Sequence, residues 1–269
     1  MIEKITFGDL SLSYHFKYAS KLPFFMDNKE ISFKPGLNII YAPNGTGKST
    51  ILSILAKSTA SEQGGVSTLT QHWFHDIFNR DENRMGEIKV AHDGQPVVYI
   101  NSRNAIGLIG GGAGFDDDFF KEGFTETKLH ESSGFTTMHR LKKAMAILCG
   151  EEKIADSYNM KNFYSSDKDK RHEVFLMPSI AHGQKTILLD EPESGLAIHA
   201  QSNLWNIIDK GAKEQNIQVI AATHSPFSLA CDANFIELSP DYINIAKEKI
   251  LTLALQLNIM QKIKEKQDE

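Results

Sequence analysis

The sequence predicts an α/β protein with a mostly parallel central sheet covered by helices. Short apolar runs typical of buried strands recur along the chain, at Leu37–Tyr41, Thr186–Asp190 and 217–223, and segments with helical spacing separate them. A turn-rich loop follows the first run and leads directly into one of these helical segments. Strands that alternate with helices are typical of a parallel sheet whose two faces are both covered.

The first hundred residues predict strands around one helix. Residues 2–16 and 30–34 are rich in strand-forming side chains and predict an N-terminal antiparallel β subdomain. Residues 48–57 predict a helix, because Ile51, Leu52 and Leu55 share one face. Residues 85–101 predict a hairpin that turns at Asp93–Gly94 and is followed by a buried strand at 97–100.

The middle of the chain has a different character. Residues 103–180 combine a glycine-rich run at 107–114, a helical stretch at 136–149 and a polar, lysine-rich stretch at 151–171. We therefore expect one domain over 1–269, with a core formed by 1–102 and 181–240. An inserted helical lobe would occupy 103–180. A helix near residues 204–208 and a strand at 235–238 complete the core, and residues 241–269 predict a helix with apolar residues at steps of three and four.

Composition limits the class of protein. The chain has 269 residues, of which 41% are hydrophobic and 23% charged, which is ordinary for a globular domain. The net charge of -5 gives no global attraction to nucleic acid, although it leaves a local contact possible. Only two cysteines, Cys149 and Cys231, and no apolar run of about 20 residues predict a cytoplasmic protein without membrane insertion.

Residues 42–49 predict a phosphate-binding loop. They read Ala-Pro-Asn-Gly-Thr-Gly-Lys-Ser and match G-x-x-x-x-G-K-[ST] except that Ala42 replaces the first glycine. Small residues allow backbone N–H groups to surround a phosphate, and the following helix directs its positive N-terminus at the same place. Lys48 would reach the β- and γ-phosphates of ATP, and the Ser49 hydroxyl would bind Mg²⁺. The predicted nucleotide-binding residues are Pro43, Asn44, Gly45, Thr46, Gly47, Lys48, Ser49 and Thr50.

Two adjacent carboxylates end the strand at Thr186–Asp190. We expect Asp190 to hold Mg²⁺, either directly or through water. Glu191 would polarise the water that attacks the γ-phosphate. This division of roles suits phosphoryl transfer, in which positioning and charge neutralisation carry most of the catalysis.

These residues carry a resemblance to ABC-type P-loop ATPases. Residues 187–196 resemble the Walker B motif and D-loop of that family, and residues 222–226 resemble its switch-histidine loop. The resemblance implies that His224 contacts the γ-phosphate and that Lys48, Glu191 and His224 form the catalytic set. It also implies a homodimer joined by ATP and Mg²⁺, in which a signature loop closes over the partner's nucleotide. We place that loop at Ser132, Ser133 and Gly134.

The sequence departs from the family pattern in three further motifs. Phe135 follows the signature loop where the family usually has Gln or Glu, and Ala197 replaces the D-loop aspartate. The Q-loop glutamine appears as Asn101 or Ser102. An aromatic residue near the N-terminus, Tyr14 or Phe16, is the candidate to stack on adenine.

Three settings are open for such an ATPase. Residues 190–196 resemble the RecF, SMC and OLD-like ATPases, which predicts a subunit that gates a separate effector, such as a nuclease or toxin, in DNA handling or anti-phage defence. The first alternative is the ATPase subunit of an ABC transporter, coupled to membrane chains near its Q-loop. The second is a nucleotide-dependent scaffold with little turnover, which the water-orienting position of Glu191 argues against.

Overall fold

The computed structural model describes most of the predicted core. The described residues are 1–13, 16–28, 30–58, 88–93, 95, 97–101, 141–142, 144–151 and 184–267. Most of the predicted helical lobe at 103–180 lies outside them, as do Tyr14, the glycine-rich run and the signature loop.

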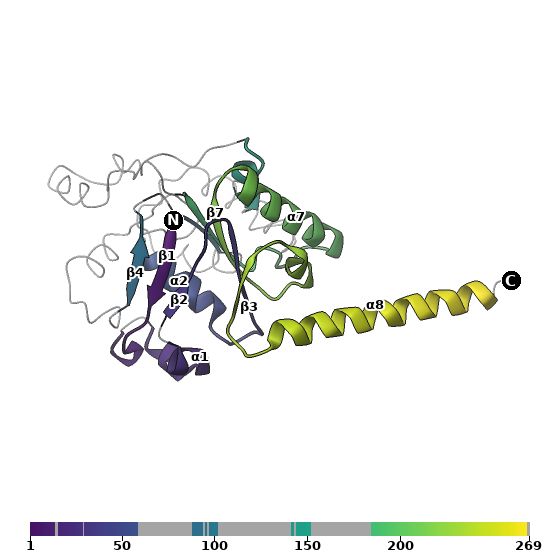
Figure 1. Cartoon of the computed structure of the whole chain (residues 1–269), viewed down its shortest axis with the longest axis horizontal. Helices are drawn as coiled ribbons and strands as arrows, with labels where there is room; N and C mark the ends of the chain where they lie inside the picture. The colour runs from purple at the N-terminus through teal and green to yellow at the C-terminus, as the bar shows by residue number, and fades with distance from the viewer. Residues whose placement is uncertain are drawn as a thin grey trace, which may run out of the picture.

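A five-stranded parallel sheet forms the centre of the molecule (Figure 1). Its strand order is β5-β6-β7-β3-β8, and every neighbouring pair is parallel. The strands are β3 (Leu37–Tyr41), β5 (Val97–Asn101), β6 (Thr186–Asp190), β7 (Gln218–Thr223) and β8 (Asn234–Glu237). This arrangement confirms the predicted fold class.

Helices cover both faces of this sheet. Because side chains alternate along a strand, Ile40, Leu188 and Ile220 face one layer, while Ile39, Leu189 and Val219 face the other. The first layer contains α2 (Lys48–Ser58) and the second contains α7 (Ile198–Glu214). Helical residues 141–142 and 144–148 also belong to the second layer, in agreement with the predicted helix at 136–149. Burial on both faces explains why the strands are continuous apolar runs.

A separate antiparallel sheet covers the α2 side, with strand order β2-β1-β4. It consists of β1 (Ile2–Thr6), β2 (Glu30–Ser32) and β4 (Lys89–His92). Strand structure was predicted through residue 16, which is wrong beyond Thr6. Short helices follow there instead: η1 (Leu10–Leu12), η2 (Lys17–Lys21) and α1 (Pro23–Asp27). The Asp9 side chain accepts a hydrogen bond from the Ser11 N–H and so caps η1.

The predicted hairpin over 85–101 is also wrong. β4 pairs with β1 in the antiparallel sheet, whereas β5 pairs with β6 in the central sheet. The amino group of Met1 forms an ion pair with Asp93, and the Asp93 N–H donates to the carbonyl of Met1. These contacts hold the end of β4 beside the start of β1. After Asp93 the chain therefore passes from the antiparallel sheet to the central one.

Gln218 joins the two sheets at the start of β7 and is fully buried. Its Oε1 accepts hydrogen bonds from the Ile2 N–H at 2.8 Å and from the Thr186 hydroxyl at 2.9 Å. Its Nε2 donates to the carbonyls of Ile2 at 2.8 Å and Lys34 at 3.0 Å. One side chain thus satisfies backbone groups of the antiparallel sheet from within the parallel one.

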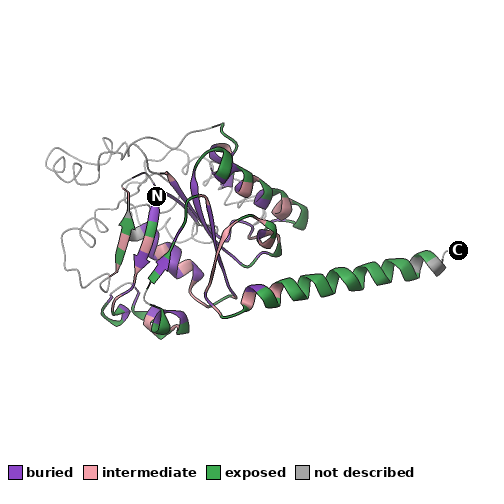
Figure 2. Cartoon of the chain, in the orientation of Figure 1, coloured by how far each residue is buried: buried purple, intermediate pink, exposed green. Residues whose placement is uncertain are grey.

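The remaining elements follow β7. Helix η7 (Pro226–Ala230) leads to β8, and α8 (Tyr242–Gln267) comes next. Ile243 is buried against the second layer, but most of α8 extends away from the body into solvent (Figures 1 and 2).

Candidate functional site

The predicted phosphate loop connects β3 to α2 in a conformation that only glycine adopts readily. Gly45 and Gly47 have φ angles of 80° and 108°, in the left-handed region. A Cβ on Gly45 would meet nothing within 4 Å, so the backbone there borders open space. A Cβ on Gly47 would lie 2.8 Å from the ring of Phe25, which packs beneath the loop. The loop is therefore supported from one side and accessible from the other.

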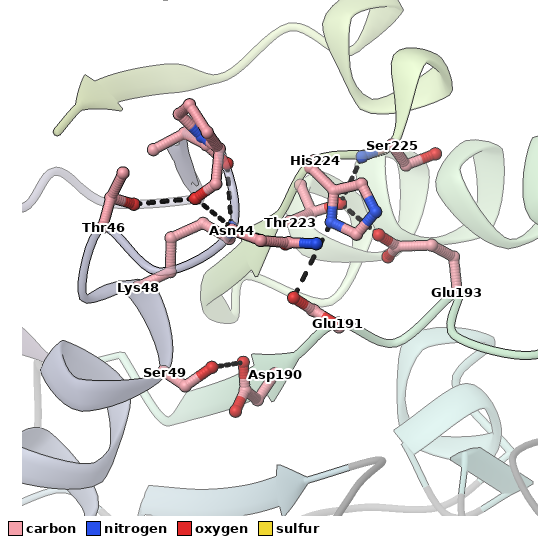
Figure 3. A network of polar contacts seen from close by, with 12 residues as sticks. Asn44, Thr46, Lys48, Ser49, Asp190, Glu191, Glu193, Thr223, His224 and Ser225 are labelled. Carbon is pink, nitrogen blue, oxygen red and sulfur yellow. Dashed lines mark hydrogen bonds and ion pairs between the residues drawn. The ribbon is translucent and has the colours of Figure 1, made fainter. Parts of the chain in front are cut away.

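Lys48 is the first residue of α2, and its ammonium group turns back over this loop (Figure 3). Its Nζ donates to the carbonyl oxygens of Ala42 at 2.8 Å and Pro43 at 2.9 Å. The Thr46 hydroxyl also donates to the Pro43 carbonyl, at 2.8 Å. The positive charge is consequently held at the mouth of the loop, beside the positive N-terminus of α2.

Ser49 and Asp190 connect the loop to the end of β6. The Ser49 hydroxyl donates to Asp190 Oδ1 at 2.9 Å (Figure 3). These two residues are 141 positions apart in the sequence. One hydroxyl and one carboxylate form a hard-oxygen pair of the kind that Mg²⁺ binds.

Glu191 has a left-handed backbone, with φ of 45°, although it is not glycine. Such a conformation costs on the order of 1–3 kcal/mol and persists only where surrounding structure imposes it. Here the Glu191 N–H donates to the Ala222 carbonyl of β7 at 2.8 Å. The Glu191 carboxylate is 4% exposed, and its Oε1 lies 3.7 Å from His224 Nδ1. The imidazole is 45% exposed, so it links a buried acid to solvent.

Glu193 is a buried acid beside these groups that sequence analysis did not assign to the site. Its carboxylate forms a hydrogen bond with the Thr223 hydroxyl, and the same hydroxyl oxygen accepts from the Ser225 N–H at 2.8 Å (Figure 3). Burial raises the pKa of Glu193 from 4.5 to about 7, against the lowering effect of the Thr223 bond. Among the described residues, Glu193 Oε2 has no hydrogen-bond partner.

Tyr41, the last residue of β3, connects the switch loop to α8. Its hydroxyl donates to the His224 carbonyl at 3.4 Å, and its ring lies 5.6 Å from the ring of Tyr242. Burial raises the pKa of Tyr41 to about 12, so the phenol remains a donor at neutral pH. The start of α8 is therefore two contacts away from His224.

The residues present fit magnesium and a triphosphate. Among the described residues, no group of three or more His, Cys, Asp or Glu could form a metal cage made of protein alone. Mg²⁺ bound with nucleotide needs no such cage, because phosphates and water complete its coordination beside one or two protein oxygens. Ser49 and Asp190 supply those oxygens, and Lys48 supplies the cation that a triphosphate requires.

The structure brings five of the predicted residues to one edge of the sheet: Lys48, Ser49, Asp190, Glu191 and His224 (Figure 3). Ser132, Ser133 and Gly134 lie outside the described residues, as do Ser102 and Phe135. Asn101 ends β5, in register with Asp190. Ala197 precedes α7 and gives it no side-chain cap.

Of the two aromatic residues predicted to stack on adenine, Tyr14 lies outside the described residues and Phe16 can be examined. Phe16 is buried in the core, 2% exposed, and so cannot stack on adenine. Tyr18 is 55% exposed, and its hydroxyl lies 3.1 Å from that of Thr50 in the first turn of α2. Sequence analysis did not single out Tyr18, because nothing in its sequence context marks it as exposed.

A phosphate loop before a helix, two acids at a strand end and a histidine directly after the next strand define a P-loop nucleotide-binding protein of the ABC type. A family model described as an AAA domain matches residues 22–269. The chain belongs to this family.

Two curated proteins are similar to the chain. The lipoprotein-releasing system ATP-binding protein LolD of Granulibacter bethesdensis is 22% identical over 212 residues, which cover 75% of this chain and 80% of LolD. The uncharacterised ABC transporter ATP-binding protein MJ0873 of Methanocaldococcus jannaschii is 24% identical over 186 residues. That match covers 69% of this chain and 57% of MJ0873, which is less than two thirds of its length.

Among solved structures, CbiO1 of Clostridium perfringens, part of the ABC transporter complex CbiONQ, is similar to the chain with a TM-score of 0.44 and 17% sequence identity. The alignment covers 98% of this chain and 100% of CbiO1.

Proposed function

We propose that this chain binds ATP with Mg²⁺ and hydrolyses it to ADP and phosphate. The observation that carries the proposal is the 2.9 Å hydrogen bond from Ser49 to Asp190, which joins the phosphate loop to the acids of β6. In an ATPase of this kind the protein contributes mainly positioning and charge neutralisation. Bound Mg²⁺ would neutralise charge on the β- and γ-phosphates.

Each residue of the site has a role in this reaction. Lys48 neutralises charge on the phosphoryl group that is transferred, and the N–H groups of the loop bind the β-phosphate. Glu191 orients the attacking water and accepts its proton. His224, 3.7 Å from Glu191, donates a hydrogen bond to the γ-phosphate and responds to its loss. Tyr18 provides the exposed ring next to α2 on which adenine stacks.

We further propose that ATP joins two copies of the chain through the signature loop at Ser132, Ser133 and Gly134. The support is the resemblance of the motifs to ABC-type ATPases, which work in this way. ATP would favour the joined state and hydrolysis the separated one, because the nucleotide contacts both copies only when they are together.

The comparisons favour the ATPase subunit of an ABC transporter as the setting. MJ0873 is an ABC transporter ATP-binding protein by name, and LolD is by name the ATP-binding protein of a lipoprotein-releasing system. In this reading a partner chain supplies the membrane span. A second setting, in which the ATPase gates a separate effector in DNA handling or defence, rests on the resemblance of residues 190–196 to the RecF, SMC and OLD-like ATPases. The chains that copurify with the tagged protein distinguish the two: membrane permease subunits support the first setting, and a nuclease or a toxin supports the second.

The central experiment compares Glu191→Gln with Lys48→Ala. We expect Glu191→Gln to lower steady-state ATP turnover by about 100-fold or more, because a positioned base contributes that much, while ATP affinity is retained. Lys48→Ala should lose both affinity and turnover. Glu214→Gln on the exposed end of α7 is the matched control. Undiminished turnover in Glu191→Gln, or absence of ATP affinity in the wild-type protein, would refute the proposal.

A further inference from the structure

Helix α8 begins in the core and ends in solvent. Its first turn is fixed by Ile243, which is 7% exposed, and by Tyr242, whose ring lies against Tyr41. Beyond this turn the helix extends away from the body, and almost all of it is exposed (Figures 1 and 2). Because α8 spans 26 residues, it is about 39 Å long at about 1.5 Å per residue.

The exposed part of α8 is apolar on more than one face. The large apolar side chains that are at least one third exposed are Ile245, Ile250, Leu251, Leu253, Leu255, Leu257, Ile259, Met260 and Ile263. A helix that is apolar all round is normally buried in protein or in a membrane. No helix in the described part of the chain has the length and apolar character needed to cross a bilayer. A protein surface is the cover that the spacing of these side chains favours.

The spacing of these side chains identifies that surface. Leu251, Leu255 and Ile259 follow one another at intervals of four and form one row. Glu248 and Lys262 lie on the same face, seven residues before and after Leu255. The row is thus symmetric about Leu255 in its apolar residues, and its two ends carry opposite charges.

The opposite face has the same centre. Ile250, Leu253, Leu257 and Met260 are spaced by three, four and three residues, and the midpoint of this second row is again at residue 255. Because both rows are centred on residue 255, an antiparallel pair of α8 helices would have the same register whichever row formed the contact. An isologous contact between identical surfaces requires such symmetry, whereas a contact with an unrelated protein does not.

We propose that α8 pairs antiparallel with α8 of a second copy of this chain, with Leu255 at the two-fold axis. Leu251 of each copy then faces Ile259 of the other, and Glu248 faces Lys262. A parallel pair would instead place Glu248 opposite Glu248 and Lys262 opposite Lys262, which is unfavourable. The pairing also opposes the dipoles of the two helices. It does not involve nucleotide, and it is separate from the proposed ATP-joined interface.

Charge reversal tests the proposal on the full-length, nucleotide-free protein. We expect the wild-type chain to associate, and Glu248→Lys or Lys262→Glu alone to weaken the association by about tenfold at low salt, since each turns two attractive pairs into repulsive ones. The double variant should restore it. Glu265→Lys, near the far end of α8 and off both rows, is the control, and analytical ultracentrifugation is the measurement. A monomeric wild type, or a double variant that stays weak, would overturn the proposal.

Cysteine crosslinking tests the direction of the pair. Cys149 and Cys231 would first be replaced by serine. Leu255→Cys should then form a disulfide-linked dimer by itself. Glu248→Cys should crosslink only when mixed with Lys262→Cys. Crosslinking of Glu248→Cys with itself would show a parallel pair, and a Leu255→Cys variant that stays uncrosslinked under oxidation would exclude the two-fold at that residue. Glu248, Leu255 and Lys262 are exposed, so the cysteine substitutions at these positions are expected to fold normally.

Discussion

Replacing Glu193 by glutamine is expected to stabilise the protein at neutral and alkaline pH. The Glu193 side chain is buried beside Glu191 and Asp190, and its only hydrogen bond among the described side chains is with Thr223. Burial raises its pKa from 4.5 to about 7. The folded protein therefore holds this proton more tightly than the unfolded chain does. Glutamine keeps the shape of the protonated acid and a hydrogen-bonding group for Thr223, and it has no proton to lose.

The magnitude follows from the two pKa values. Their difference, 7 minus 4.5, is about 2.5, which corresponds to about 3.5 kcal/mol at about 1.4 kcal/mol per pKa unit. The sign follows from proton linkage: the unfolded chain releases the proton first as pH rises. The wild-type free energy of unfolding should thus fall between pH 4.5 and about pH 7 and then level off. In Glu193→Gln this contribution to the pH dependence disappears.

Urea denaturation at several pH values from 5 to 8 measures the effect. The free energy of unfolding of Glu193→Gln minus that of the wild type should increase with pH, by as much as about 3 kcal/mol across the range. Glu214→Gln, at an exposed position of α7, should give a curve parallel to that of the wild type. If Glu193→Gln also ran parallel to the wild type, the assignment of a buried, protonated acid at this position would be refuted.

Three further substitutions test the packing and the site. Gln218→Glu removes the donor to the carbonyls of Ile2 and Lys34 and buries a charge, so it should lower the free energy of unfolding by about 3 kcal/mol or more in urea denaturation. The control Gln215→Glu, at an exposed position, should have little effect. If the two variants were equally stable, the proposed role of Gln218 in holding the two sheets together would be contradicted. Gly211→Ala places a Cβ 2.6 Å from the backbone oxygen of Leu148, which should cost about 1–3 kcal/mol, whereas Asn206→Ala on the exposed face of α7 should not destabilise. Ser49→Ala should weaken ATP binding by about tenfold only when Mg²⁺ is present, because the lost hydroxyl is a proposed metal ligand; fluorescence titration with and without Mg²⁺ measures this, and an equal loss in both conditions would contradict that role.

The central strands could be predicted from sequence because both of their faces are buried. β3 and β6 begin and end where their apolar runs do, at Leu37–Tyr41 and Thr186–Asp190. All five residues of each strand are buried, so no alternation of polar residues obscures the signal. The phosphate loop was predictable for a similar reason, since Gly45 and Gly47 adopt backbone angles that other residues disfavour.

The features that sequence analysis missed depend on contacts between distant segments. Asp93–Gly94 has the residues of a hairpin turn, but the ion pair between Met1 and Asp93 directs the chain to another sheet. Glu193 follows an ordinary acidic loop pattern, and only the approach of Thr223 from β7 shows that it is buried. The exposure of α8 likewise depends on the direction in which its first turn leaves the core. Local sequence patterns predict helices and strands, but they do not predict which other helices and strands these contact.

The convergence of the site residues is a consequence of strand order. β7 lies between β3 and β6, and its register places Tyr41 beside Thr223 and Asp190 beside Ala222. The segments that follow these three strands therefore begin at the same edge of the sheet. The hydrogen bond between Ser49 and Asp190 passes over the end of β7, which lies between β3 and β6. Ala222 and Ala42 face the α2 layer at this point and are fully buried. Their small side chains leave room for α2 to approach the sheet. Ala42, which replaces the first glycine of the phosphate-loop pattern, therefore contributes to the packing that brings Ser49 to Asp190.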